Sequence, residues 1–452
     1  MNAPLTRRLV IDDEGRIGAP TQAWRDFIAS ERARPIDWGL RPAEGLGSLA
    51  RRLFRDLALY DQPRHPAVPL LHWPMLRQIA LAAHAGYCWA RLASAVARRN
   101  GRSRTEQARD MVRLAWRERL DAQTYYMQEL YRSGGARRAA DTLTRYETKN
   151  GLFSALRRLA PRQPAERSPL GDKLAFHARC RQHHVPAVPV LMSAIRGRLE
   201  TLDGGVAEGC DLFVKLRRGK GARGTTLLRY AGAGAYLLPD GRLCALDAYL
   251  RELARASTRA DYLVQPRLVN HADIADLASE SLIVIRVITC LDAVGTPQVT
   301  HGMLRVIAKL EPSWNDATEY AAPIDLRTGR MGAMTGDKLP GILDWHERHP
   351  LTGAPVAGRL LTAWPDVQAA AIKAHRAFTD RILLGWDIAV TPDGVIIVEG
   401  NAMPDVAFLQ RVHRQPIGQS PLAPLLRHHL QRLELQHSYP LTRSPTSRSW
   451  PL

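Results

Sequence analysis

The sequence predicts an α+β fold in which a mostly helical N-terminal region precedes a part built from short strands and helices. Apolar residues recur at helical intervals from residue 66 to 159. Short strands separated by glycine turns follow at 211–247, and two apolar runs joined by a tight turn occupy 384–401. A proline-rich segment, 160–169, separates the two parts. A chain of 452 residues can form about two or three packed units of this kind.

The N-terminal region contains three helical patterns, at 66–99, 106–130 and, more weakly, 139–159. No motif that carries chemistry occurs in them. We therefore expect residues 1–165 to form a helical cap, or a module that docks a partner or a membrane.

The later elements follow in order along the chain. We expect a short helix capped near Asp172, and then further helices and strands at 211–247, 247–256, 262–265, 282–291, 299–308 and 367–383. The last residues, 436–452, are rich in proline, serine, threonine and arginine, which predicts a disordered tail.

Composition limits the partners and the compartment. The hydrophobic fraction of 45% and the charged fraction of 24% are ordinary for a globular protein, whereas the net charge of +19 predicts attraction to polyanions, including anionic membrane surfaces. Because arginines in helical segments supply most of this charge, we do not expect nucleic acid to be a partner. The five cysteines are scattered, and neither a signal peptide nor a membrane span is evident. We therefore expect a cytoplasmic protein.

The turn Thr391-Pro-Asp-Gly394 joins two apolar runs and predicts a β-ribbon with a three-residue loop. In that register Asp387 lies opposite Glu399, and Asn401 follows on the same face. Two carboxylates and an amide oxygen form the kind of site that Mg²⁺ occupies when it also holds nucleotide phosphates. The alternative is a surface ribbon whose acids face water. Glu399 ends a Val-Ile-Ile-Val run typical of a buried strand, which favours the metal site.

A second candidate site begins at Lys215, which lies within a strand that enters a glycine-rich loop. Gly219, Gly221 and Gly224 allow backbone N–H groups to curl around an anion, and nearby basic residues add positive charge. The pattern matches neither a P-loop nor a dinucleotide fingerprint. A basic hairpin tip is the alternative. A lysine inside a strand favours phosphate binding, because a buried cation needs a partner.

Two arginines occupy apolar strands, Arg286 at 281–291 and Arg305 at 302–309. Each must meet a carboxylate or an anionic ligand, so a structural ion pair and a ligand clamp are both open. Their recurrence on successive strands favours an anion-binding site. The strand at 262–265 ends at Pro266, which frees backbone groups that can bind a purine, although a plain strand end explains this segment as well.

This succession of parts resembles the ATP-grasp superfamily. More narrowly, residues 168–415 look like the sugar-transfer-associated ATP-grasp family. The stretches that carry the resemblance are Leu263-Val-Gln-Pro-Arg-Leu-Val-Asn-His271, Ser281–Thr289, Ile324-Asp-Leu-Arg-Thr-Gly329, His349-Pro-Leu-Thr-Gly353, and Gly385-Trp-Asp-Ile-Ala389 with Glu399-Gly-Asn401 and Leu409-Gln410.

The resemblance implies an ATP-grasp fold, in which two α+β subdomains clasp ATP, at residues 166–435. The first subdomain and lid would span 166–264, and the metal-binding subdomain 265–435. Nucleotide contacts would come from Lys173, Lys215, the glycine-rich loop, the segment Gln265, Pro266 and Leu268, and, for the ribose, Asp273. Asp387, Glu399 and Asn401 would hold one or two Mg²⁺ ions. Gly385 stands where many superfamily members carry an arginine, so Arg286 and Arg305 would have to supply that charge and act in catalysis.

The function implied is an ATP- and Mg²⁺-dependent ligase that joins a small-molecule carboxylate to an amine or hydroxyl through an acylphosphate. The narrower family suggests a role in cell-surface polysaccharide or glycoconjugate synthesis, with a glycan acceptor or with proteins of polysaccharide synthesis as partners. Two alternatives remain: a kinase of a sugar or alcohol, and a non-enzymatic basic protein that binds polyanions.

Overall fold

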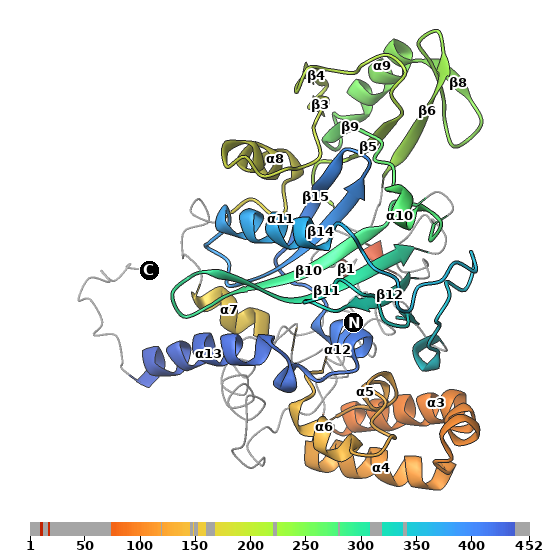
Figure 1. The fold of residues 1–452 in the computed structure, drawn as a ribbon, viewed down its shortest axis with the longest axis vertical. Helices are drawn as coiled ribbons and strands as arrows, with labels where there is room; N and C mark the ends of the chain where they lie inside the picture. Colours follow the sequence, from red (N-terminus) through yellow and green to blue (C-terminus); the bar gives the residue numbers. More distant parts are fainter. Residues whose placement is uncertain are drawn as a thin grey trace, which may run out of the picture.

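The computed structural model describes residues 10–11, 17–18, 74–118, 120–144, 148, 152–159, 168–219, 224–278, 281–307, 319–337 and 341–438. Its parts follow one another along the long axis of the molecule (Figure 1). A sheet of seven mostly short strands, here called the smaller sheet, lies at one end. A sheet of six strands, most of them longer, lies in the middle and is here called the larger sheet. Helices of the N-terminal region lie at the other end. The mixture of helices with antiparallel sheets confirms the α+β class.

The N-terminal region contains the helices α3 (Pro74–Asn100), α4 (Arg104–Glu118), α5 (Ala122–Met127), α6 (Gly135–Asp141) and α7 (Phe153–Leu159), besides a two-residue strand pair, β1 (Val10–Ile11) and β2 (Ile17–Gly18). A capping box starts α4: the Ser103 N–H donates to Glu106 over 2.8 Å, and the Glu106 N–H donates to the Ser103 hydroxyl over 3.2 Å. Apolar residues from α3 to α6 share one core with Ile342 and Leu343, which come about 200 residues later in the chain.

Two of the expected helices differ from those observed. The pattern at 106–130 is broken, because the Asp121 carboxylate accepts the Thr124 N–H over 2.8 Å and starts the new helix α5. The pattern at 139–159 is also not one helix, since α6 ends at Asp141 and α7 begins at Phe153. Periodicity alone does not reveal such interruptions when apolar residues continue on both sides.

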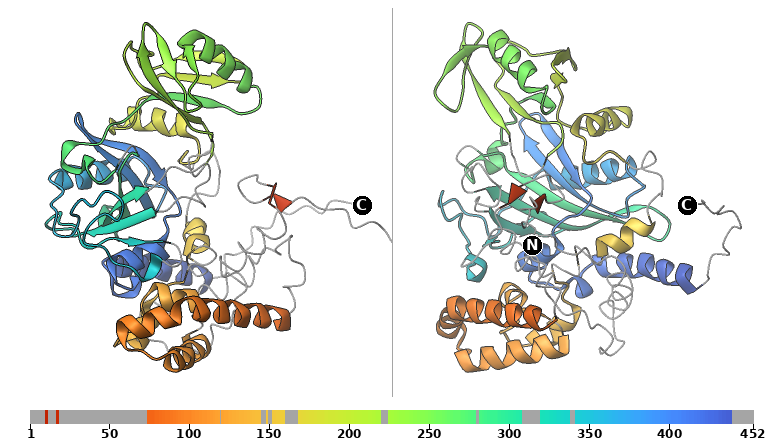
Figure 2. Two further views of the ribbon diagram at one scale, coloured as in Figure 1. Left: turned by 90° about the vertical axis from the view of Figure 1, so that its right-hand side faces the viewer. Right: turned by 180° about the vertical axis from the view of Figure 1, so that it is seen from behind.

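The smaller sheet has the strand order β4-β3-β9-β5-β6-β7-β8. Its elements are β3 (Met192–Ile195), β4 (Arg198–Thr201), β5 (Leu212–Leu216), β6 (Thr226–Gly232), β7 (Ala235–Leu237), β8 (Leu243–Ala245), α9 (Leu246–Ala256) and β9 (Tyr262–Pro266). Leu250 and Leu253 of α9 pack with Val214 and Val264 in the core of this sheet. The helix α8 (Lys173–Gln182) lies at the junction with the larger sheet (Figure 2).

The larger sheet is antiparallel, with the order β13-β12-β11-β10-β14-β15. Its strands are β10 (Val284–Leu291), β11 (Pro297–Ile307), β12 (Glu319–Ile324), β13 (Thr335–Gly336), β14 (Leu383–Thr391) and β15 (Gly394–Asn401). The helix α11 (Trp364–Arg376) packs on one face. The other face is partly covered by α7, α12 (Val406–His413) and α13 (Leu422–Ser438). Short helical segments α10 (Ala272–Ala275), η4 (Gly341–Leu343) and η5 (Ile417–Gln419) complete the fold.

The ribbon of β14 and β15 reaches the expected pairing by a different path. Thr391 pairs with Gly394, so the loop has two residues rather than the expected three. Ile388 then pairs with Ile397, and a bulge at Val398 places Glu399 opposite Asp387. The predicted pairing of the two acids is therefore confirmed, although the predicted loop is wrong.

The bounds of α11 and α13 differ from the expected ones. The predicted helix at 367–383 begins earlier, at Trp364, and its regular turns end at Arg376. α13 continues to Ser438, and the rest of the expected tail lies outside the described residues. Among the helices of the described part, none is both long and apolar enough to cross a bilayer.

Candidate active site

The acids of the ribbon lie together on one face of the larger sheet. Asp387 is 6% exposed, on a strand that is buried along its whole length. The Asn401 amide reaches both acids, donating to Asp387 over 3.3 Å and to Glu399 over 3.4 Å. The three predicted metal ligands are therefore neighbours in space.

Both predicted arginines meet carboxylates on this face. Arg286 lies directly across the strand pair from Asp387, and its Nε and Nη2 bind the two carboxylate oxygens, the latter over 2.8 Å. Arg305 binds Glu319 in the same two-pronged way, with Nη2 2.9 Å from Oε2. Its remaining amino group, Nη1, lies 3.4 Å from Asp387 Oδ1.

The pKa values of the two acids of the ribbon are shifted in opposite directions. Burial acts to raise the pKa of Asp387, but Arg286 and Arg305 outweigh it and hold that pKa below its usual value. Burial and the neighbouring Asp387 raise the pKa of Glu399. Asp387 is buried and Glu399 is partly buried, so these neighbouring carboxylates cannot both ionise at low cost unless a cation separates them.

Two lysines, one at the start of α8 and one on β5, interact electrostatically with this site. Val214 of β5 packs into the core beneath α9, and the alternation of a strand places Lys215 on the opposite face. Burial lowers the pKa of Lys215 to about 8, against the opposing effect of the Glu399 charge. Burial also lowers the pKa of Lys173, again against the opposing effect of the Glu399 charge. The two predicted phosphate-binding lysines and the acidic ribbon thus lie within electrostatic range of one another.

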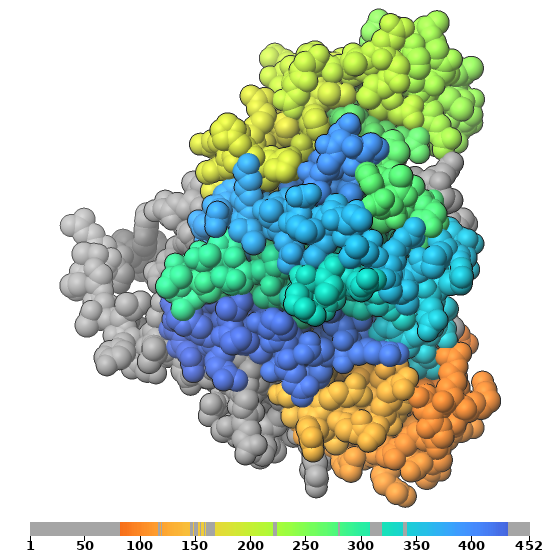
Figure 3. Space-filling model, in the orientation of Figure 1, coloured from red at the N-terminus to blue at the C-terminus, as the bar shows by residue number. Residues whose placement is uncertain are grey.

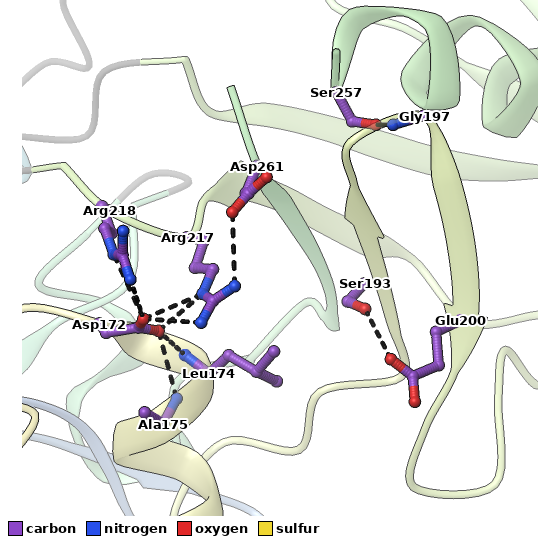
Figure 4. A network of polar contacts seen from close by, with 10 residues as sticks. All are labelled: Asp172, Leu174, Ala175, Ser193, Gly197, Glu200, Arg217, Arg218, Ser257 and Asp261. Carbon is purple, nitrogen blue, oxygen red and sulfur yellow. Dashed lines mark hydrogen bonds and ion pairs between the residues drawn. The ribbon is translucent and has the colours of Figure 1, made fainter. Parts of the chain in front are cut away.

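A network of ion pairs fixes the start of α8 beside the end of β5 (Figure 4). The Asp172 carboxylate caps α8 by accepting the Leu174 and Ala175 N–H groups, each over 3.2 Å. It also binds Arg217 over 2.8 Å and Arg218 over 2.9 Å. Lys173, the first residue of the helix, is thereby held at the glycine-rich loop.

One end of the glycine-rich loop lies beside Lys173. The Lys173 ammonium donates to the Gly219 carbonyl over 2.8 Å. Gly224 has φ +62°, and a Cβ there would lie 3.2 Å from Leu216, so a larger residue would be strained. Gly221 lies outside the described residues.

In the predicted adenine segment, the side chain of Gln265 makes hydrogen bonds within the protein. The buried Gln265 side chain donates to the carbonyls of Val188 and Pro189, each over 3.2 Å, and so is directed to the linker after α8. That linker in turn lies beside β15, where the Val188 N–H donates to Ile397 over 3.2 Å. Pro266 pairs with Leu212 at the end of β9, and Leu268 follows it outside the strand.

Asp273 is not brought into this cluster by any observed contact. It lies in α10, where it accepts from the Thr362 hydroxyl and has His271 Nδ1 3.6 Å from its carboxylate. Its assignment to the ribose stays a prediction from the resemblance.

The structure gives a physical reason for the glycine at position 385. A Cβ there would lie 2.9 Å from Pro404 and 3.4 Å from Arg286 Cδ, so the stem of Arg286 occupies space beside this position. That Arg286 and Arg305 supply the positive charge needed here stays a prediction from the resemblance.

Glu319 was not predicted from the sequence. It is only 4% exposed and opens the apolar strand β12. The rule that singled out Arg286, a charge in an apolar strand that must have a partner, applies equally to this residue.

The oxygen donors suit a divalent ion that keeps other ligands. No group of three or more His, Cys, Asp or Glu side chains within the described residues is arranged to hold a metal. The ribbon offers two carboxylates and one amide, which fits Mg²⁺ because this ion usually takes its remaining ligands from water and phosphate oxygens. Burial and the Asp387 charge raise the pKa of Glu399, and a cation bound beside both acids would lower it again.

Comparison with solved structures finds partial matches. One structural match is an N5-carboxyaminoimidazole ribonucleotide synthetase in complex with ADP (12% identity, 52% of this chain, 46% of the other, TM-score 0.32). Two others are the D-alanine-D-alanine ligase from Coxiella burnetii (12% identity, 60% of each chain, TM-score 0.32) and the D-Ala:D-Ser ligase from Enterococcus faecalis (14% identity, 63% and 62%, TM-score 0.33).

The matched part spans less than two thirds of each of these three proteins. No curated protein sequence matches the chain. The model of one family, described as sugar-transfer associated ATP-grasp, matches residues 157–420, which is more than half of the chain. The protein therefore belongs to the sugar-transfer associated ATP-grasp family.

Proposed function

We propose that this protein is an ATP- and Mg²⁺-dependent ligase that joins a carboxylate to an amine through an acylphosphate. The observation that supports the proposal is that Lys173 of α8 and Lys215 of β5 lie within electrostatic range of Glu399 on the acidic ribbon. Cations that can bind phosphate oxygens thus lie near oxygens that can bind a metal. The family to which the chain belongs supports the same chemistry.

Each residue has a defined part in this proposal. Asp387, Glu399 and Asn401 hold Mg²⁺, which when bound neutralises phosphate charge. Lys173 and Lys215 contact the phosphates, and the glycine-rich loop closes over them. The backbone at Gln265, Pro266 and Leu268 holds adenine, and Asp273 takes the ribose. Arg286 and Arg305 stabilise the negative charge that develops on the transferred group.

The reaction has two balanced steps. A carboxylate oxygen of the substrate bonds to the γ-phosphorus of ATP, and the bond from that phosphorus to the β–γ bridging oxygen breaks to release ADP. The amine nitrogen then attacks the acyl carbon, the carbon–oxygen bond to phosphate breaks, and the amine loses a proton. The protein contributes positioning and charge neutralisation rather than a nucleophile.

We also propose a cellular setting. The family name supports a role in cell-surface polysaccharide or glycoconjugate synthesis, with a glycan acceptor. No disulfide joins the five cysteines, which suits a reducing cytoplasm. The net charge of +19 would favour contact with an anionic membrane face.

The test is substrate-dependent release of ADP and phosphate by the full chain with ATP, Mg²⁺ and pools of acids and amines. A ligase releases both products only when an acid and an amine are present together. D387N should lower this turnover by about a hundredfold or more, because it removes a charged metal ligand. D393N, on the exposed turn of the same ribbon, is the matched control and should leave turnover unchanged.

Other outcomes identify the alternatives. Phosphate retained on an organic product would indicate a kinase. If D387N kept full turnover, the metal assignment would be wrong. Salt-dependent binding of polyanions without any ATP turnover would indicate a non-enzymatic protein.

A further inference from the structure

The positive charge next to Asp387 opposes the binding of a metal ion to that carboxylate. Its Oδ1 accepts from Arg286 and also lies 3.4 Å from Arg305 Nη1, while Oδ2 accepts from Arg286 over 2.8 Å. Any cation that binds Asp387 must compete with these guanidinium groups, and repulsion between cations is strong where water is excluded.

Glu319 controls how much of Arg305 is directed at Asp387. The carboxylate takes two of the three nitrogens of that guanidinium, with Nη2 2.9 Å from Oε2, and leaves Nη1 toward Asp387. The Glu319 side chain is 5% exposed and that of Arg305 is 11%, so water screens neither charge well. A neutral group at position 319 would leave Arg305 with Asp387 as its nearest carboxylate among the contacts observed.

The positions of the strands make this competition direct. Glu319 opens β12, Arg305 lies on the neighbouring strand β11, and Arg286 and Asp387 are paired across β10 and β14. The two arginines therefore lie on adjacent strands, with one carboxylate on the strand to either side of them. Each carboxylate limits the reach of the arginine next to it.

We propose that Glu319 is a positioning residue that limits Arg305 to one longer contact with Asp387 and so keeps Asp387 available to a divalent cation. The proposal rests on the proposed function, because it takes Asp387 as a metal ligand. Glu319 contacts neither metal nor substrate in this role and acts only through Arg305.

The test measures Mn²⁺, as a probe for Mg²⁺, bound to the full chain in the presence of saturating ADP, by electron paramagnetic resonance of the free ion. E319Q should weaken Mn²⁺ binding by about tenfold or more, as is usual when a residue that orients a metal ligand is lost. The affinity for ADP without metal should not fall, because Arg305 remains charged. A merely structural role would not separate these two affinities.

A double variant makes the test specific. E319Q/R305Q removes the competing cation together with its partner, and it should bind Mn²⁺ more tightly than E319Q does. E319D keeps the charge on a shorter side chain, so it should retain most of the wild-type affinity. Thermal unfolding would reveal whether E319Q fails to fold. In that case the double variant E319Q/R305Q still supplies a comparison, because it leaves neither Glu319 nor Arg305 as an unpaired charge.

The proposal is overturned if E319Q binds Mn²⁺ as tightly as the wild type, or if the double variant binds it no better than E319Q. Failure of the proposed function has a different signature. A wild-type chain that binds Mn²⁺ and ADP but never releases ADP with acids and amines would not be a ligase, while the effect of Glu319 on metal binding would stand.

Discussion

At the scale of single residues, the site is a set of buried charges that compensate one another. Arg286 and Arg305 are neutralised by Asp387 and Glu319, and Lys215 has only a partial partner in Glu399. A buried cation without a close carboxylate favours its neutral form, which is why the pKa of Lys215 falls to about 8. Such a group will respond strongly to an incoming anion.

We therefore expect nucleotide binding to take up protons at pH 8. The free chain holds Lys215 about half neutral there, and nearby phosphates would raise its pKa, so up to about half a proton enters on binding. Calorimetry of metal-free ADP in buffers of different ionisation enthalpy measures this uptake. The contribution should vanish at pH 6, where the lysine is already charged, and K215M should remove it. An unchanged uptake in K215M would place the proton elsewhere.

At the scale of elements, close packing of α11 on the larger sheet depends on a glycine. A Cβ at Gly302 of β11 would lie 2.3 Å from the ring of Trp364, the first residue of α11. That ring is 2% exposed and its Nε1 donates to the Leu326 carbonyl over 2.9 Å, so it has little freedom to move.

G302A should therefore destabilise the protein by about 2–3 kcal/mol, as overpacking of a rigid core does. Urea denaturation followed by tryptophan fluorescence measures the change. G86A is the matched control, since nothing lies within 4 Å of the Cβ it would add to helix α3. It should be neutral or raise stability by about 0.5–1 kcal/mol. Equal effects of the two substitutions would contradict the packing argument.

At the scale of the whole molecule, the N-terminal helices are joined to the ATP-grasp part by a buried acid. Glu129, which is 3% exposed, lies 3.3 Å from Arg411 Nη1 and accepts from Trp345 over 3.0 Å. Arg411 and Arg414 stack on that tryptophan at 4.3 and 3.7 Å from its ring centre. Figure 3 shows these helices packed directly against the C-terminal segments. The helical region is thus an integrated layer of the fold.

Loss of this acid should destabilise the whole molecule. E129Q leaves Arg411, which is 1% exposed, without its charged partner, and the expected cost is about 3–5 kcal/mol. The exposed pair of Glu252 and Arg242, 3.2 Å apart, provides the control, because E252Q should change stability by less than about 1 kcal/mol. Chemical denaturation compares the two. Similar small effects would mean that the Glu129 ion pair does not hold the helices in place.

The sequence by itself determined the local chemistry. The α+β class, the acids opposite each other on the ribbon and the cap of α8 at Asp172 all depend on periodicity, turn residues or capping, which act within a few residues. Charges in apolar strands were also evident as groups that need partners, but Glu319 was missed because no strand was expected at 319–324.

Only the tertiary structure decided which partners these charges take. Arg286 meets Asp387 across 101 residues, and Arg305 shares its donors between Glu319 and the same acid. Gln265 turned out to hold a linker, and a bulge at Val398 rather than a longer loop set the ribbon's register. Ion pairing depends on distances of a few ångströms between strands remote in sequence, and no local pattern encodes those distances.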